Sequence, residues 1–306
     1  MEEYIVSVGN ISTLKEYVVG CIGYFDGFHI GHQTLFNKTI ALAKHKNLKS
    51  ALITFDPDPW VVLKGLHNIQ HITTLHDRKK YAQEKGFDCW ITLQFDLAMA
   101  QLKPDEFLDL LIQHKIAHLV CGFDFKFADK GSGDVLTLKS QKKIPVSILE
   151  EFDYQDAKVS TTRIIEAIKV GDMRMVSKLL GKPYKITGIV VHGKRIGTQI
   201  GFPTANLKVD QEYVIPKIGV YAGFVQVDGM QYPSMISIGY NPTVKDDDSV
   251  SIEAHLFDYA NNLYGKQLEY SFTYYLRPEM KFNGLEELII QLRKDEMDAR
   301  KILKKL

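Results

Sequence analysis

Apolar residues in the first half of the chain gather in short runs that are separated by longer amphipathic segments. Five such runs cover residues 18–25, 50–55, 88–93, 117–123 and 144–149. Continuous apolar runs of this length are typical of strands that are buried on both faces of a sheet. Segments with helical spacing cover residues 33–46, 75–86, 104–114 and 161–180. The alternation predicts an α/β domain built on a doubly wound parallel sheet.

The second half of the chain has a different pattern. Beyond Pro183, short segments rich in Val, Ile, Tyr and Phe follow one another without helical segments between them, at residues 186–191, 219–227, 232–239, 249–259 and 268–276. Strands of this size, bounded by Gly, Asn, Asp and Pro, predict a small antiparallel β-barrel. An apolar stripe over residues 284–306 predicts one terminal helix. We therefore expect two domains, residues 1–182 and residues 183–306.

Composition and charge narrow the class of protein. The chain has 306 residues and a net charge of +1, which fits two ordinary domains and argues against a strongly basic nucleic-acid binder. Cys21, Cys89 and Cys121 are far apart in apolar surroundings, so we expect reduced core residues. Without a secretory start or an apolar run of about 18 residues, the pattern predicts a cytoplasmic protein without a membrane partner. It leaves the oligomeric state open.

The first candidate for chemistry is the segment GYFDGFHIGHQTLF, residues 23–36. It joins an apolar run to a helix, and a glycine-rich turn of this kind points backbone N–H groups at a phosphate. His29 and His32 are three residues apart, so both imidazoles can face that phosphate. Two isolated histidines at this spacing are more often a capped helix end or a metal pair. Zinc would need a third ligand, and the P-loop pattern is absent from the sequence.

The whole segment resembles the HxGH signature of nucleotidylyltransferases, and its FDG resembles the flavin-specific branch found in prokaryotic bifunctional riboflavin kinase/FAD synthetases. The segments TFDPDP (54–59), VCGFDFKF (120–127) and VSTTRIIEAIKVGD (159–172) follow in the family's order. The resemblance implies an FMN adenylyltransferase domain. It assigns a catalytic role at the ATP phosphates to His29 and His32. It assigns ATP binding to Gly23, Phe25, Asp26, Gly27, Gly31, Ser160, Thr161 and Thr162. It assigns the flavin to Asp124 and Phe125.

Three residues depart from the family pattern in this domain. Asp58 stands where the family has histidine, and a negative charge near phosphates is unfavourable unless a cation neutralises it. Ile165 stands where the family has arginine, so a charge-assisted phosphate contact is lost. Ala128 replaces a glycine. These departures bear on whether the adenylyltransferase domain is active.

The second candidate for chemistry is the segment GKRIGTQIGFPTANL, residues 193–207. Gly193, Gly197 and Gly201 permit a loop that wraps closely around a nucleotide. The PTAN sequence adds a rigid turn with a hydroxyl at Thr204 and an amide at Asn206. A hydroxyl beside phosphates is a suitable Mg²⁺ ligand, although PTAN alone could be a simple turn.

Together with Glu253, this segment resembles riboflavin kinase over nearly all of residues 185–306. Further matching segments are GVYAG (219–223), SIGYNPTV (237–244), SIEAHLFDY (251–259), NLYGK (262–266) and residues 276–295. The resemblance implies that Thr204 and Asn206 serve Mg²⁺ and phosphate and that Glu253 is the catalytic base. It places ATP near Gly193, Lys194, Gly197 and Gly201, and the flavin near Arg277, Glu279 and Phe282. Thr198 stands where the family has a basic residue, and Lys194 or Arg195 can supply that charge.

The resemblance thus implies an enzyme of flavin biosynthesis that phosphorylates riboflavin to FMN and adenylylates FMN to FAD with release of pyrophosphate. Its substrates would be riboflavin, FMN and ATP, with Mg²⁺ as cofactor and no nucleic-acid partner. Three alternatives remain open at this stage. They are a paralogue with one active module, a flavin-binding regulator without turnover, and a transferase whose first module uses a different acceptor.

Overall fold

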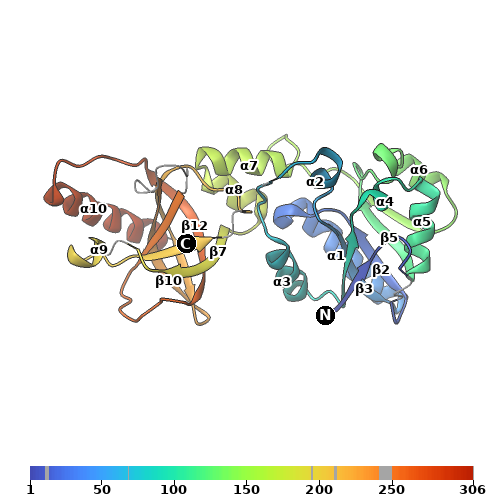
Figure 1. Ribbon diagram of the computed structural model, residues 1–306, viewed down its shortest axis with the longest axis horizontal. Coiled ribbons are helices and arrows are strands. Elements are labelled where there is room, and N and C mark those ends of the chain that lie inside the picture. Colours follow the sequence, from blue (N-terminus) through green and yellow to red (C-terminus); the bar gives the residue numbers. More distant parts are fainter. Residues whose placement is uncertain (11–13, 68, 194–195, 210–211, 241–249, 306) are drawn as a thin grey trace. The chain divides into compact units, whose positions relative to one another are not determined.

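The computed structural model describes residues 1–10, 14–67, 69–193, 196–209, 212–240 and 250–305, and it divides into two compact units. The first unit is Met1–Ser160, and the second is Thr161–Leu306. Figure 1 shows an α/β fold in the first and strands that form a barrel in the second. The predicted fold class, an α/β domain followed by an antiparallel barrel with a terminal helix, is confirmed.

The first unit is built on one parallel sheet of six strands in the order β1-β4-β3-β2-β5-β6. All neighbouring strands in it run parallel. The strands are β1 (Glu2–Val6), β2 (Val18–Ile22), β3 (Lys49–Asp56), β4 (Cys89–Gln94), β5 (Ile116–Gly122) and β6 (Val146–Leu149). The last five match the predicted apolar runs. Strand β1 was missed because it lies at the sheet edge and its first four residues alternate between half-buried and exposed.

Helices connect the strands and cover the sheet. They are α1 (Ile30–Lys46), α2 (Pro59–Lys64), α3 (Leu75–Lys85), α4 (Leu97–Ala100), α5 (Pro104–Gln113) and α6 (Val135–Ser140). Helices α1, α3 and α5 agree with the predicted segments. The other three have at most six residues, which is too short for a helical period to show in the sequence.

Two apolar clusters lie on the two sheet faces, as the alternation along β2 shows. Val18 and Ile22 belong to one cluster, and Val19 and Cys21 belong to the other. All three cysteines are buried and free, as expected. Because strand order reverses at β2, whose neighbours are β3 and β5, the carboxyl ends of β2 and β5 flank the position where parallel α/β sheets bind ligands.

The second unit contains a closed antiparallel barrel in the order β10-β11-β8-β7-β12-β9. Its strands are β7 (Tyr184–Val191), β8 (Ala205–Val209), β9 (Gly219–Val227), β10 (Met230–Tyr240), β11 (Val250–Leu256) and β12 (Gln267–Arg277). Five of them match the predicted strands. Strand β8 was missed because it has only five residues and the first two of them belong to the PTAN segment, which was interpreted as a turn.

Helix α10 (Leu285–Leu303) packs on the barrel, and α9 (Ile196–Gln199) is a single turn. The segment predicted as one helix over 161–180 is two, α7 (Thr161–Val170) and α8 (Met173–Leu180). Gly171, with φ of 82°, breaks the segment, and Asp172 caps α8. Both helices group with the barrel because α8 packs against β12 and β7. The predicted boundary at residue 182 stays a prediction about the functional modules.

Ala128 has a backbone conformation that favours glycine, with φ of 65° and ψ of −175°. Alanine is strained in this conformation, and this explains why the family pattern has glycine at the position of Ala128. We predict that Ala128→Gly raises the free energy of unfolding by about 1 kcal/mol, despite the loss of a partly buried methyl group. Urea unfolding measures the change. Ala41→Gly is the matched control, because Ala41 is exposed in α1 and glycine there should lower stability by about 1 kcal/mol. A loss of stability in Ala128→Gly would contradict the assignment of strain.

Candidate functional site

The turn between β2 and α1 is the centre of the site in the first unit. Phe25 and Gly27 have positive φ values of 57° and 78°, which fold the chain sharply after the strand. The Gly27 N–H donates to Thr73 Oγ1 at 2.9 Å. A Cβ at Gly27 would lie 3.1 Å from the Ile72 side chain, so the close approach of these segments favours glycine. The predicted phosphate-binding residues Gly23, Phe25 and Gly27 thus belong to one tight turn.

His29 and His32 form a stacked pair at the start of α1. Their ring centroids are 3.5 Å apart with an interplanar angle of 21°. His29 is the N-cap residue, and its Nδ1 accepts the His32 N–H at 3.3 Å. A neutral imidazole whose Nδ1 accepts carries its proton on Nε2, so His29 keeps one N–H donor. A Cβ at Gly31 would lie 3.2 Å from the His29 ring, so Gly31 leaves room for the ring over the first turn.

Burial keeps both imidazoles in their neutral form. It lowers the pKa of His29 to about 4, although the charge of Asp124 opposes the change. Burial also lowers the pKa of His32 well below its ordinary value, and the proximity of His29 lowers it further. The Nδ1 atom of His32 is buried without a hydrogen-bond partner among the described residues. The pair therefore offers neutral imidazoles to a phosphate near pH 7.

Asp26 anchors the turn. Its carboxylate oxygens accept the Ile72 N–H at 3.0 Å, the Thr73 N–H at 2.9 Å and the Thr73 hydroxyl at 3.1 Å. The residue is only 4% exposed. These contacts give Asp26 a positioning role that the sequence did not reveal, and its predicted contact with ATP stays a prediction.

The loop after β5 carries the predicted flavin-side residues. Asp124 accepts a hydrogen bond from Lys158 Nζ at 2.6 Å, and the Lys158 ammonium lies over the Phe123 ring. Phe125 packs on the core and stacks on Phe127. Asp124 and Lys158 both act on the pKa of His29, so their charges lie near the histidine pair. Lys158 was missed because its link to Asp124 spans 34 residues of sequence.

The serine and threonine residues of the predicted triphosphate site are divided along the chain between the two units. Ser160 ends the first unit, and Thr161 and Thr162 form the first turn of α7 in the second. Ile165 follows on the same helix. The predicted contacts of these residues with the triphosphate stay predictions.

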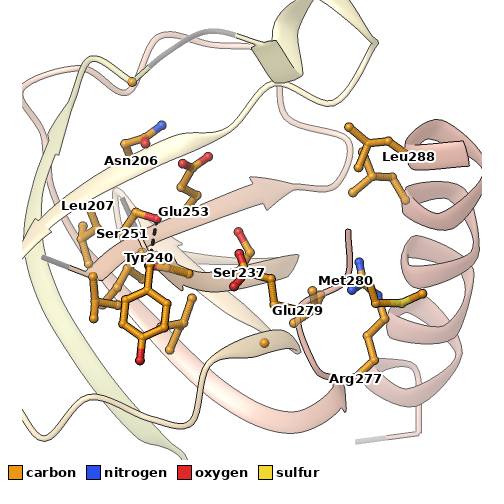
Figure 2. A pocket seen from close by; sticks show the side chains of 18 of the residues that line it. Asn206, Leu207, Ser237, Tyr240, Ser251, Glu253, Arg277, Glu279, Met280 and Leu288 are labelled. Atoms are coloured by element: carbon orange, nitrogen blue, oxygen red, sulfur yellow. Dashed lines mark hydrogen bonds between the residues drawn. The ribbon is translucent and has the colours of Figure 1, made fainter. Parts of the chain in front are cut away.

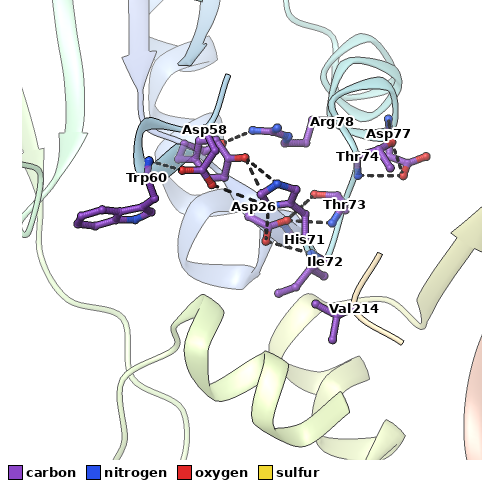
Figure 3. Close-up of polar contacts among 12 residues, drawn as sticks. Asp26, Asp58, Trp60, His71, Ile72, Thr73, Thr74, Asp77, Arg78 and Val214 are labelled. Atoms are coloured by element: carbon purple, nitrogen blue, oxygen red, sulfur yellow. Dashed lines mark hydrogen bonds and ion pairs between the residues drawn. The ribbon is translucent and has the colours of Figure 1, made fainter. Parts of the chain in front are cut away.

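Asp58 has a local partner. Its Oδ1 accepts the Trp60 N–H at 2.7 Å and thereby caps α2. The side chain is buried among polar groups, where its Oδ2 lies 4.0 Å from His71 Nδ1 (Figure 3). An imidazole nitrogen thus lies beside this carboxylate.

In the second unit, three predicted residues meet on neighbouring strands. The Thr204 hydroxyl donates to Glu253 Oε2 at 3.0 Å. Asn206 on β8 is the cross-strand partner of Glu253 on β11, and Ser237 on β10 pairs with Glu253 from the other side. Figure 2 shows Asn206, Glu253 and Ser237 on the strands that face the pocket. Side chains at paired positions share one face of the sheet, so these polar groups form one row.

The predicted glycines belong to a closely packed loop. A Cβ at Gly193 would lie 2.3 Å from Asn206 Nδ2, and one at Gly197 would lie 2.2 Å from the Phe202 carbonyl oxygen. Gly201 has a positive φ of 86°. Lys194, for which we predicted a phosphate contact, lies outside the described residues, as do residues 241–244 of the segment 237–244.

A cavity of about 730 Å³ collects most of the predicted kinase residues. Those that line it are Gly193, Asn206, Glu253, Arg277, Glu279 and Phe282. In Figure 2 it is bounded by barrel strands on one side and by Leu288 of α10 on the other. Thr204 lies in a neighbouring pocket of about 160 Å³, together with Thr198. The volume of the larger cavity suits a small-molecule substrate.

Arg277 has a structural partner in this cavity. Its Nε and Nη2 donate to Asp295 Oδ2 at 2.9 and 2.8 Å, and Nη1 donates to the Pro278 carbonyl oxygen. Asp295 on α10 is only 3% exposed. This buried pair fixes the segment that carries Glu279 and Phe282, so Arg277 positions this wall of the cavity. Asp295 gave no signal in the sequence, because one acidic residue in an amphipathic helix is usually solvated.

No group of three or more His, Cys, Asp or Glu side chains among residues the structure describes could hold a metal ion. Thr204 and Asn206 do bring a hydroxyl oxygen and an amide oxygen to the neighbourhood of Glu253, and oxygen atoms of this kind suit Mg²⁺ that also binds ATP phosphates. The donor set therefore fits a metal that arrives with the nucleotide.

The lowered pKa of His29 makes a prediction about stability. Since its folded-state value of about 4 lies below the ordinary 6.5, the unfolded chain takes up this proton first as pH falls. The wild-type protein should lose about 2 kcal/mol at this site between about pH 7.5 and about pH 5. His29→Gln should lack that part of the loss in urea unfolding, with His76→Gln as the control for an exposed histidine. An equally steep profile in His29→Gln would contradict the assigned burial.

Comparisons with known proteins agree for both units. The FAD synthetase family matches residues 11–163, and the riboflavin kinase family matches residues 180–303. A bifunctional riboflavin kinase/FMN adenylyltransferase of Listeria monocytogenes is 39% identical over 94% of this chain and 93% of that protein. The Bacillus subtilis protein of the same name is 37% identical over 92% and 91%, and that of Escherichia coli is 33% identical over 97% and 96%.

A solved structure described as a macrolide-efflux protein from Streptococcus pneumoniae has the same fold. It superposes with a TM-score of 0.89 at 30% identity and covers 97% of this chain and 98% of that one. In the part of this chain that the structure describes, no helix is long and apolar enough to span a membrane. With two family matches and near full-length relatives, the chain belongs to the bifunctional riboflavin kinase/FMN adenylyltransferase family, enzymes of flavin cofactor biosynthesis that form FMN and FAD.

Proposed function

We propose that the second unit transfers the γ-phosphoryl group of ATP to riboflavin, with Glu253 as the general base. The observation that carries this assignment is the contact of 3.0 Å between Thr204 Oγ1 and Glu253 Oε2 beside the large cavity. Glu253 takes the proton of the ribityl 5′-hydroxyl while the hydroxyl oxygen attacks the γ-phosphorus, and ADP leaves. Thr204 holds the carboxylate in place before the substrate arrives.

Mg²⁺ fits this site, where Thr204 and Asn206 would hold it together with the ATP phosphates. When bound, such an ion neutralises charge on the transferring phosphoryl group. The glycines of residues 193–201 let backbone N–H groups approach the same phosphates. Arg277, Glu279 and Phe282 line the side where the isoalloxazine ring would lie.

The first unit transfers the adenylyl group of ATP to FMN in this proposal. The FMN phosphate is already an anion, so it attacks the α-phosphorus without a base, and pyrophosphate leaves. The remaining task is to position two polyanions and stabilise the charge that develops between them. The neutral His29 and His32 imidazoles and the N–H groups at the start of α1 suit that task.

The remaining assignments follow from this chemistry. Riboflavin, FMN and ATP are the substrates, and Asp124 and Phe125 lie on the flavin side of the first site. The net charge of +1 supports small-molecule substrates over a nucleic-acid partner. We place the reaction in the cytoplasm, where ATP is available. The departures at Asp58 and Ile165 favour one second candidate, a chain in which only the kinase is active.

Reciprocal variants test these roles. Glu253→Gln should lower FMN formation from riboflavin by about 100-fold or more while FAD formation from FMN stays intact, because only the first reaction needs a base. His29→Ala should show the opposite pattern. Products are resolved by chromatography after incubation with ATP and Mg²⁺, using oxidised and reduced flavin.

Each variant is thus the control for the other. An unchanged rate of FMN formation in Glu253→Gln would remove this residue as the base. FMN formation without FAD formation in the wild-type protein would favour the kinase-only chain, and flavin binding without either product would indicate a regulator.

A further inference from the structure

Five polar side chains gather in and around the β2–α1 turn. The reaction proposed above does not require any of them to act directly on the transferred group. They are Tyr24 and the four residues Asp26, Asp58, His71 and Arg78, which are labelled in Figure 3. Asp26, Asp58 and Arg78 are 4%, 8% and 3% exposed. Charged groups buried this deeply are costly unless they have partners, so their arrangement needs a reason.

His71 lies between the two carboxylates. Its Nδ1 is 4.0 Å from Asp26 Oδ2 and 4.0 Å from Asp58 Oδ2. The Tyr24 hydroxyl lies 3.4 Å from each nitrogen of the same ring. Among the basic side chains that the structure describes, His71 is the one within 4.0 Å of these carboxylates.

Arg78 ties the same turn from the other side. Its Nη1 donates to the Tyr24 carbonyl oxygen at 2.7 Å, and its guanidinium lies over the Tyr24 ring. Burial raises the pKa of Tyr24, with Arg78 opposing the change and both carboxylates adding to it. Tyr24, Arg78 and the two carboxylates therefore interact electrostatically.

The two carboxylates next to His71 position different elements of the first unit. Asp26 fixes the turn that leads directly to His29, and Asp58 caps α2, which carries the exposed Trp60. A change at His71 thus reaches both elements, although His71 belongs to none of the motifs that the sequence showed. At position 58 the family pattern has histidine, whereas this chain has an aspartate. The imidazole next to this aspartate comes from His71 instead.

We propose that His71 is a positioning residue for adenylyl transfer, which bridges Asp58 and Asp26 and so holds His29 and α2 in their working arrangement. The inference rests on the proposed assignment of the first unit to FMN adenylylation. Loss of the imidazole leaves two buried carboxylates without their shared partner. The turn then shifts, and the histidine pair loses its position relative to the phosphates.

A double-mutant cycle tests the bridge. Asn is used at both positions. At position 58 its amide oxygen can still cap α2, and at position 71 its side chain is polar and no larger than that of histidine. His71→Asn should lower kcat for FAD formation by about tenfold or more, with KM for FMN changed less than about twofold. Asp58→Asn should have a similar effect. The double variant should be no worse than the poorer single variant, because the two residues act through one contact.

Two controls accompany the cycle. His76→Asn makes the same change at an exposed position of α3 and should leave kcat within about twofold of wild type. FMN formation from riboflavin should stay unchanged in every variant, which shows that the second unit is folded. If His71→Asn behaves like His76→Asn, or if the two single losses multiply in the double variant, the bridge is wrong.

Hydrogen exchange gives a readout that does not depend on activity. Amides of residues 23–29 should exchange at least about tenfold faster in His71→Asn than in wild type, while those of β4 in the sheet core stay protected. Faster exchange in a protein whose wild type forms no FAD would support the bridge and reject the adenylylation assignment. Unchanged exchange at residues 23–29 would overturn the bridge whatever the activity.

Discussion

The buried carboxylate of Asp26 fixes the geometry on which the first site depends. It accepts hydrogen bonds from the backbone N–H groups of Ile72 and Thr73, and so it joins the β2–α1 turn to a segment about 46 residues later in the chain. That turn contains three residues with positive φ, Phe25, Gly27 and Phe28, and ends at His29. Because an unpaired carboxylate would be costly at this depth, the turn has one stable position. The helix N-terminus and the imidazole pair can then face a phosphate without reorganising.

The second unit solves a related problem with strands instead of a turn. Cross-strand pairing sets Asn206 beside Glu253, and the Thr204 hydroxyl holds the carboxylate. The ion pair of Arg277 with Asp295 then ties the opposite wall of the cavity to α10. In both units, the groups proposed to contact phosphate or the substrate hydroxyl are held by hydrogen bonds within the protein. Such preorganisation is a general source of catalysis in reactions that move phosphoryl groups.

The sequence predicted what depends on short spacing. The period of apolar residues gave the parallel sheet, the barrel and the longer helices, and the three-residue interval between His29 and His32 gave their common face. Elements whose signal is weak were missed, such as the edge strand β1 and the five-residue β8. The contacts of Asp295 with Arg277, Lys158 with Asp124 and His71 with Asp58 could not be predicted. Each joins residues that only the folded chain brings together, and none belongs to a local pattern.

In the proposed reaction sequence, two separate sites act in succession, one in each unit. Mixing the variants Glu253→Gln and His29→Ala with riboflavin, ATP and Mg²⁺ tests it most directly, with FAD followed by chromatography over time. Neither variant alone should form FAD from riboflavin. The mixture should form it after a lag in which FMN accumulates, because FMN made by one protein is adenylylated by the other. Absence of FAD from the mixture, when each variant retains its own remaining activity, would contradict the account.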